Sequence, residues 1–279
     1  MTLSNLGKRL IVAAVGIPAL VFIIREGDWW LYIFCILVSV LGSWELAAML
    51  LGKQIEIGKQ LATVLAILLV SMFQFSQQIF INSQSFSSGE AGLLFIFIMF
   101  VIVAYLKMAK FGVENYTTRL SLAILTAIYP AFFISFSILI HRDFGPDGWI
   151  ILLFVFVNTW IADTFAYGFG RWLGKRKLAP IISPKKTWVG FFASFLGGAF
   201  TAFLFYVAMP DLKIERLIAL SLAATLFGQV GDLIESAIKR DCGVKDSSNL
   251  IPGHGGVLDR FDSLMMALPA VYFLLRIWG

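Results

Sequence analysis

Long hydrophobic runs separated by short polar stretches follow one another along the whole chain. Most of them approach the roughly 20 residues that a helix needs to cross a bilayer. The pattern therefore predicts an all-α polytopic integral membrane protein with about nine transmembrane helices. The runs are Leu10–Ile24, Trp29–Leu51, Leu61–Ile81, Leu93–Leu106, Leu120–Ile140, Trp149–Phe169, Trp188–Met209, Leu217–Ser236 and Phe261–Trp278.

The composition agrees with a membrane protein, and the basic residues give its orientation. Of the 279 residues, 59% are hydrophobic and only 14% are charged, whereas a soluble domain carries roughly 25% charged residues. Most of the 22 Lys and Arg fall in alternate loops, and basic loops stay in the cytoplasm. We expect a multi-pass protein of the inner (cytoplasmic) membrane with a cytoplasmic N-terminus. The first run is interpreted as a retained helix, because no small-residue cleavage site follows it.

The net charge of +5 belongs to these inner loops, where attraction to membrane lipids with anionic headgroups accounts for it. No nucleic-acid partner is expected, because the basic residues are not set in a soluble module with stacking aromatic residues. Cys35 falls inside a hydrophobic run and Cys242 in an inner loop. We therefore expect neither a disulfide nor a thiolate metal site.

Polar residues distinguish the two halves of the chain. The hydrophobic runs before Arg142 contain few of them. One exception is Glu45, which we interpret as paired with a cation or as extending to the headgroups. The sixth and eighth runs instead end in polar clusters. We divide the chain into a transmembrane scaffold, residues 1–141, and a catalytic part, residues 142–279. Neither part is expected to fold alone.

The segment Ser236–Asp262 concentrates charge between two hydrophobic runs. Charge near a membrane is costly unless it is paired or serves a site. We therefore predict an active site at the bilayer surface. The charged residues of the segment are Lys239, Arg240, Asp241, Lys245, Asp246, Asp259, Arg260 and Asp262, and it also contains His254.

Three aspartates, two in this segment and one just before it, present hard oxygen ligands of the kind that suit Mg²⁺. Asp232 shares one helical face with Gly228 and Lys239, and an ion pair with Lys239 or Arg260 is the alternative interpretation of its carboxylate. The predicted metal ligands are Asp232, Asp246 and Asp259. No His or Cys spacing suits zinc.

Gly253, Gly255 and Gly256 surround His254. Glycines let backbone N–H groups turn inward as an anion-binding nest. Three roles fit His254, namely general acid or base, hydrogen-bond donor to a phosphate, and anchor of the loop. We favour the phosphate contact, because phosphoryl chemistry depends mainly on positioning and charge neutralisation.

The loop after the sixth run contains two groups of polar residues. Topology alone accounts for the cations of the first group, Arg171, Lys175, Arg176 and Lys177. In the second group, Ser183 or Thr187 is predicted to cap the seventh helix and to donate to an anion. Lys185 or Lys186 between them is predicted to contact a phosphate.

The motif in this segment resembles the signature of the phosphatidate cytidylyltransferases, also called CDP-diacylglycerol synthases. The resemblance covers at least residues 163–262. It implies transfer from CTP to phosphatidic acid, giving CDP-diacylglycerol and pyrophosphate, with a second cation such as K⁺ beside Mg²⁺ and a homodimer. The residues that carry the motif are Ser236, Lys239, Arg240, Lys245, Asp246, Ser248, Ile251, Pro252, His254, Gly255, Gly256, Asp259, Arg260 and Asp262.

We assign the site residues in three groups, the third being the metal ligands named above. The expected catalytic residues are Lys239, Arg240, Lys245, His254, Arg260 and Asp262. The expected substrate-binding residues are Asp163, Ser183, Lys185, Lys186, Thr187, Gly255 and Gly256.

Two alternatives to this function are open. A related enzyme would use another lipid phosphate or act as a CTP-dependent lipid kinase. A transporter would use intramembrane carboxylates for ion coupling, but it would place them near the bilayer midplane in both halves. Here the charged residues lie in one half and toward one face.

Overall fold

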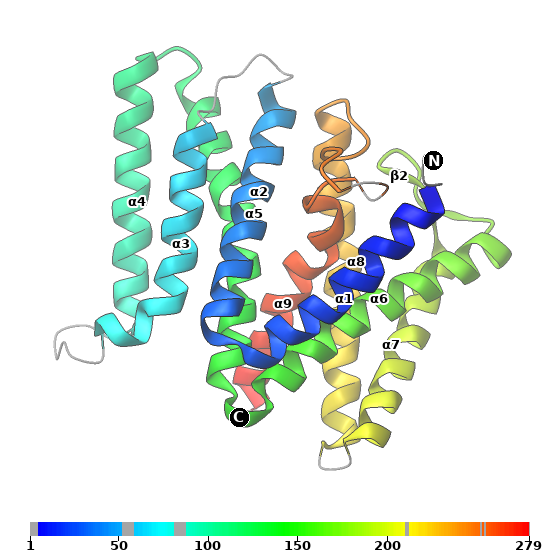
Figure 1. Ribbon diagram of the computed structural model, residues 1–279. Helices are drawn as coiled ribbons and strands as arrows, with labels where there is room; N and C mark the ends of the chain where they lie inside the picture. Colours follow the sequence, from blue (N-terminus) through cyan, green and yellow to red (C-terminus); the bar gives the residue numbers. More distant parts are fainter. Residues whose placement is uncertain are drawn as a thin grey trace. The chain divides into compact units, whose positions relative to one another are not determined.

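The computed structural model describes residues 5–51, 59–80, 88–209, 212–251, 253 and 255–278. These residues form nine α-helices, one 3₁₀ helix and two short strands (Figure 1). The all-α prediction is confirmed, and each predicted run overlaps one helix. The α-helices are α1 (Asn5–Glu26), α2 (Asp28–Leu51), α3 (Lys59–Phe80), α4 (Ser88–Phe111), α5 (Tyr116–Asp143), α6 (Gly148–Leu173), α7 (Trp188–Ala208), α8 (Ile214–Asp241) and α9 (Leu258–Trp278), and the other elements are η1 (Gly145–Asp147), β1 (Lys177–Ala179) and β2 (Ser183–Thr187).

Within the described ranges, six segments are long and apolar enough to cross a membrane. The protein is therefore a multi-pass membrane protein, and the count of nine spans and the orientation of the N-terminus stay predictions. The six segments are Asp28–Leu51, Tyr116–Asp143, Gly145–Leu173, Trp188–Ala208, Ile214–Asp241 and Leu258–Trp278.

The chain forms two compact units, one of residues 28–138 and one of residues 1–27 with 139–279. In the first unit α2 packs on α3, and aromatic rings such as Phe73 and Phe132 meet edge to face with 5.6 Å between their centroids. Glu45 of α2 is only 4% exposed, which favours pairing over contact with the headgroups. The second unit includes α1, which packs on α6. The assignment of scaffold and catalytic roles to the two halves stays a prediction.

In the second unit α6, α7, α8 and α9 pack each against the next. Small residues allow the close approach. A Cβ atom on Gly198 of α7 would lie 2.5 Å from the Ser221 hydroxyl of α8 and 2.7 Å from that of Thr225. The buried side chain of Asn158 on α6 donates to the Thr225 hydroxyl at 3.1 Å. This bundle holds the residues for which the sequence predicts chemistry.

A β-hairpin that the sequence analysis did not predict connects α6 to α7. Strands β1 and β2 pair antiparallel, with Lys177 opposite Thr187 and Ala179 opposite Ser183, and β2 lies at the end of the helices it connects (Figure 1). The Thr187 hydroxyl accepts a hydrogen bond from the Gly190 backbone N–H at 3.1 Å. Thr187 is thus the cap of α7, whereas Ser183 belongs to the start of β2.

Candidate functional site

A cavity of about 850 Å³ lies among α6, the hairpin, α7, α8 and the start of α9. It brings together polar residues that are far apart in the sequence. Both signs of charge line it, as in a site for a polyanion and its counter-cations. The charged residues of its wall are Asp163, Arg171, Lys177, Lys185, Lys186, Asp232, Lys239, Asp246, Asp259, Arg260 and Asp262.

Most of the residues singled out from the sequence line this cavity. The three predicted metal ligands line it, and so do Thr187 and the two lysines of β2, Lys185 and Lys186. Ser183, Arg240, Lys245, Gly255 and Gly256 are not among the lining residues, and His254 falls outside the described residues.

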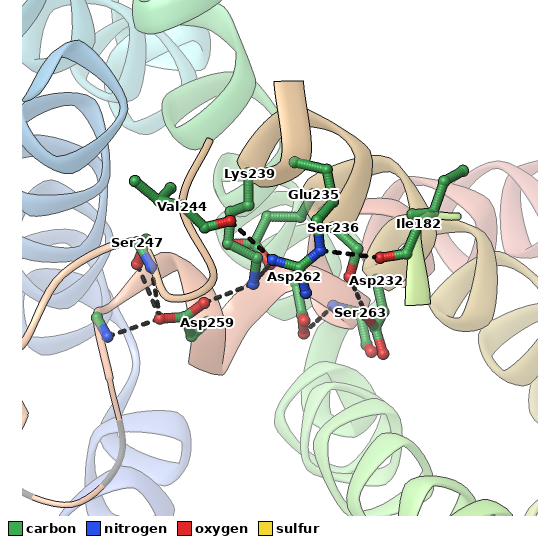
Figure 2. A network of polar contacts seen from close by, with 12 residues as sticks. Ile182, Asp232, Glu235, Ser236, Lys239, Val244, Ser247, Asp259, Asp262 and Ser263 are labelled. Atoms are coloured by element: carbon green, nitrogen blue, oxygen red, sulfur yellow. Dashed lines mark hydrogen bonds and ion pairs between the residues drawn. The ribbon is translucent and has the colours of Figure 1, made fainter. Parts of the chain in front are cut away.

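Asp259, in the first turn of α9, is the most extensively hydrogen-bonded carboxylate of the site. One oxygen accepts from the Ser247 backbone N–H at 2.9 Å, from its hydroxyl at 3.0 Å and from the Gly256 N–H at 2.8 Å. The other oxygen accepts from Lys239 Nζ at 2.5 Å (Figure 2). Asp259 therefore ties the loop between α8 and α9 to the start of α9.

The Gly-rich turn wraps this same carboxylate. Gly255 has a φ of +84°, and a Cβ atom there would lie 2.6 Å from Asp259 Oδ2. Only glycine fits both that backbone conformation and that space. In the structure, the anion that accepts the hydrogen bond from the Gly256 N–H is thus the carboxylate of Asp259. Binding of a substrate anion by this turn stays a prediction.

Lys239 bridges two carboxylates in a nearly buried position. Its Nζ lies 2.6 Å from Glu235 Oε2, one turn earlier on α8, and the side chains of Lys239 and Glu235 are 9% and 1% exposed. Its second partner is Asp259 of α9. Sequence reasoning missed Glu235 as a partner, although its spacing of four from Lys239 is that of a helical ion pair.

Asp232 forms an ion pair, but with a different cation from the two that the sequence analysis named. Lys186 Nζ of the hairpin lies 2.7 Å from its Oδ2. The Ser236 hydroxyl donates to its Oδ1 at 3.1 Å. The pair connects β2 to α8, so Lys186 and Asp232, predicted separately as phosphate contact and metal ligand, meet in the structure.

Two further carboxylates lie near Asp232. Asp163 of α6 accepts a hydrogen bond from Gln229 Nε2 at 3.3 Å, and Asp262 accepts one from the Ser263 backbone N–H at 2.6 Å. The carboxylates of Asp163 and Asp262 are each repelled by the carboxylate of Asp232. Three helices thus bring carboxyl groups to one side of the cavity, where a bound cation would favour their charged form.

Magnesium binding by the three predicted aspartates stays a prediction. Among the described residues, no three His, Cys, Asp or Glu side chains form a group that holds a metal by itself. Mg²⁺, however, usually binds through one or two carboxylates plus waters and substrate phosphates. Asp232, Asp246 and Asp259 line one cavity and supply such oxygens.

Arg240 links the hairpin to the next loop. It donates to the Ile182 carbonyl at 3.2 Å and to the Val244 carbonyl at 2.7 Å. Figure 2 labels both acceptors, and dashed lines mark the two hydrogen bonds. These contacts hold the turn of the hairpin beside the end of α8. Its predicted catalytic role, like that of Lys245, stays a prediction.

Four polar residues of the cavity wall were not predicted as site residues, namely Tyr167, Arg171, Lys177 and Gln229. Arg171 Nη1 donates to the Tyr167 hydroxyl at 2.9 Å. In the sequence analysis the positive-inside rule alone explained why Arg171 and Lys177 are basic, so neither was assigned to a site. The spacing of four between Tyr167 and Arg171 was the available signal.

Glycines let the hairpin pack closely against the end of α6. A Cβ atom on Gly174 would lie 2.3 Å from the Thr187 hydroxyl and 2.3 Å from the Gly170 carbonyl oxygen. One on Gly190 would lie 2.6 Å from the Ala166 carbonyl oxygen. Since Lys185 and Lys186 directly precede Thr187, this packing fixes where the two lysines enter the cavity.

The bundle and its cavity define a class of protein, an integral membrane protein with a cavity at one end of its helices that charged residues of both signs line. The sequence profile of the cytidylyltransferase family matches residues 7–278. The chain therefore belongs to the cytidylyltransferase family.

Individual relatives agree with this membership. The phosphatidate cytidylyltransferase of Bacillus subtilis strain 168 is 33% identical over 278 residues, 99% of each chain. That of Haemophilus influenzae is 36% identical over 245 residues, covering 83% of this chain and 85% of the relative. That of Staphylococcus epidermidis is 31% identical over 275 residues, covering 96% and 98%.

Proposed function

We propose that the protein is a phosphatidate cytidylyltransferase, which converts CTP and phosphatidic acid to CDP-diacylglycerol and pyrophosphate. The observation that carries the proposal is the cavity, whose wall holds both carboxylates and cations at one end of apolar helices. A lipid phosphate and a nucleotide are both polyanions, and such a wall suits their meeting. The names of the relatives support the same reaction.

In the proposed reaction a phosphate oxygen of phosphatidic acid attacks the α-phosphorus of CTP. A new P–O bond forms while the bond from the α-phosphorus to the bridging oxygen breaks. Pyrophosphate leaves with that electron pair. The protein provides no attacking atom, so the mechanism has no covalent enzyme intermediate.

The residues of the site would act by positioning and charge neutralisation. Lys185, Lys186, Lys239 and Arg260 line the cavity and would bind phosphates. Asp232, Asp246 and Asp259 would hold Mg²⁺, with K⁺ as the candidate second cation. When bound, such cations neutralise charge on the reacting phosphates.

We propose that the cavity faces the cytoplasm, where CTP is available, in the inner membrane of the cell. The positive-inside distribution of Lys and Arg supports this orientation. The resemblance to the family also supports a homodimer.

The first experiment is to measure pyrophosphate release by the purified protein in detergent with CTP, Mg²⁺ and phosphatidic acid. Each component is omitted in turn, and the lipid product is identified. We expect release only with all three and a CDP-lipid product. Release with a different lipid phosphate alone would favour the related-enzyme alternative, and no release by folded protein would contradict the proposal.

Replacing Asp232 by Asn tests the metal assignment. We expect activity to fall roughly 100-fold, with a higher Mg²⁺ concentration needed for half-maximal rate. Asp241→Asn is the matched control, because Asp241 is a nearby exposed carboxylate that does not line the cavity. Near-normal activity of Asp232→Asn at unchanged Mg²⁺ dependence would refute the role of Asp232.

A further inference from the structure

We propose that Tyr167, Arg171 and Lys177 form a phosphate-binding subsite of the cavity that lies outside the sequence motif. All three residues line the cavity. The inference rests on the proposed function, because it assigns phosphates of one of the two substrates to these side chains.

The first argument is the charge distribution within the wall. Lys186 and Lys239 already pair with carboxylates of the cavity. Within the described part of the chain, Arg171 and Lys177 form no salt bridge. Their charge is therefore available to a ligand, and a polyanion in the cavity would meet it without first displacing a carboxylate.

The second argument is the geometry of the Tyr167–Arg171 pair. Both lie on α6 one turn apart, and the tyrosine oxygen accepts from the guanidinium at 2.9 Å. This contact orients the guanidinium. Because the oxygen acts as the acceptor, the tyrosine proton is available to a ligand, and four further N–H groups remain on the arginine. A planar fork of donors matches a phosphate.

The third argument comes from the other two cations of the same loop. Lys175 and Arg176 have the same types of side chain and are exposed, but they do not line the cavity. Instead, Arg176 lies over the Trp188 ring, 6.0 Å from its centroid. Topology requires basic residues in this loop but does not require any of them to line a cavity. The position of Arg171 and Lys177 therefore needs a second reason, which phosphate binding provides.

The test compares Arg171→Gln and Lys177→Gln with the matched controls Arg176→Gln and Lys175→Gln. For each purified variant, kcat and the KM values for CTP and for phosphatidic acid are measured separately. We expect one of the two KM values to rise about tenfold in the cavity variants, because each loses a charge-assisted contact, and neither to change in the controls. Arg171→Lys should recover part of the effect, since it keeps the charge and loses the fork.

The substrate whose KM rises identifies the source of the phosphate, nucleotide or lipid. Tyr167→Phe should raise the same KM by about threefold, because the guanidinium loses its orienting contact. Unchanged KM values in both cavity variants would overturn the proposal, as would a lower thermal unfolding midpoint as the only effect. Failure of the proposed function is separate, because it would show in the unaltered protein as no reaction between CTP and phosphatidic acid.

Discussion

Asp259 shows how one side chain can serve both the loop and the proposed metal site. Its two oxygens accept hydrogen bonds from Ser247, Gly256 and Lys239. Hydrogen bonds to a charged group stabilise by roughly 1.5–3 kcal/mol each. The same carboxylate lines the cavity, so its replacement should affect stability and activity together.

We expect Asp259→Asn to lower the free energy of unfolding by about 3 kcal/mol and activity roughly 100-fold. The amide carries no charge, and its NH₂ group faces donors. Ser247→Ala removes the hydroxyl contact to Asp259, keeps the backbone one and should cost about 1 kcal/mol with activity largely retained. Thermal unfolding in detergent and pyrophosphate release measure the two effects, and equal behaviour of the two variants would contradict this account.

The buried Lys239–Glu235 pair gives an asymmetric prediction. Removing the cation in Lys239→Met leaves two carboxylates without their partner, and stranding a buried charge costs about 3–5 kcal/mol. In Glu235→Gln, Lys239 keeps Asp259, so we expect a loss of about 1 kcal/mol. The midpoints of thermal unfolding of the two variants test this order, and a larger loss in Glu235→Gln would show that Asp259 is not an effective partner.

At the scale of residues, the sequence indicates which side chains line the cavity but not which of them form ion pairs with one another. The motif, the intramembrane aspartates and the loop after the sixth run together led to ten of the residues that line the cavity. The pair between Lys186 and Asp232 depends on how the hairpin folds back onto α8, which no local pattern encodes. Arg171 escaped prediction because the positive-inside rule already accounted for it.

At the scale of elements, the packing of the hairpin on α6 depends on Gly174. A Cβ atom there would overlap both the Gly170 carbonyl oxygen and the Thr187 side chain that caps α7. Since Lys185 and Lys186 adjoin Thr187 on β2, a shift of the strand would move both lysines.

We expect Gly174→Ala to lower kcat about tenfold and to destabilise the protein by about 1–3 kcal/mol, as overpacking does. Gly168→Ala on α6 is the matched control, because a Cβ atom at Gly168 has no atom within 4 Å. The control should retain activity and unfold at the same or a higher temperature. If Gly174→Ala kept the activity of the control, the hairpin would not depend on this close contact.

The helices were predictable because their hydrophobic runs are long, and each run falls on one helix. The hairpin was not, because its strands are only three and five residues long and carry lysines and Pro184 in place of alternating apolar residues. Its stability comes from contacts with α6 and α7 rather than from strand propensity.

At the scale of the whole molecule, the two cysteines allow a direct test of orientation. Cys35 is fully buried, whereas Cys242 follows α8 in the loop beside the cavity and is partly exposed. A membrane-impermeant maleimide should label Cys242 in inside-out vesicles and not in right-side-out vesicles. Cys242→Ser should abolish the labelling, and labelling from the outer side alone would reverse the proposed topology.

The cavity also has a consequence for biosynthesis, because its wall is assembled from successive helices. Chains grow and insert from the N-terminus, so α6, the hairpin, α7 and α8 precede α9. Until α9 follows, Lys239 has Glu235 but lacks Asp259. In the nascent bundle Lys239 therefore has one carboxylate partner instead of two. Insertion of α9 adds the second carboxylate partner and the remaining wall residues of the cavity, so the site is complete only once α9 has joined the bundle.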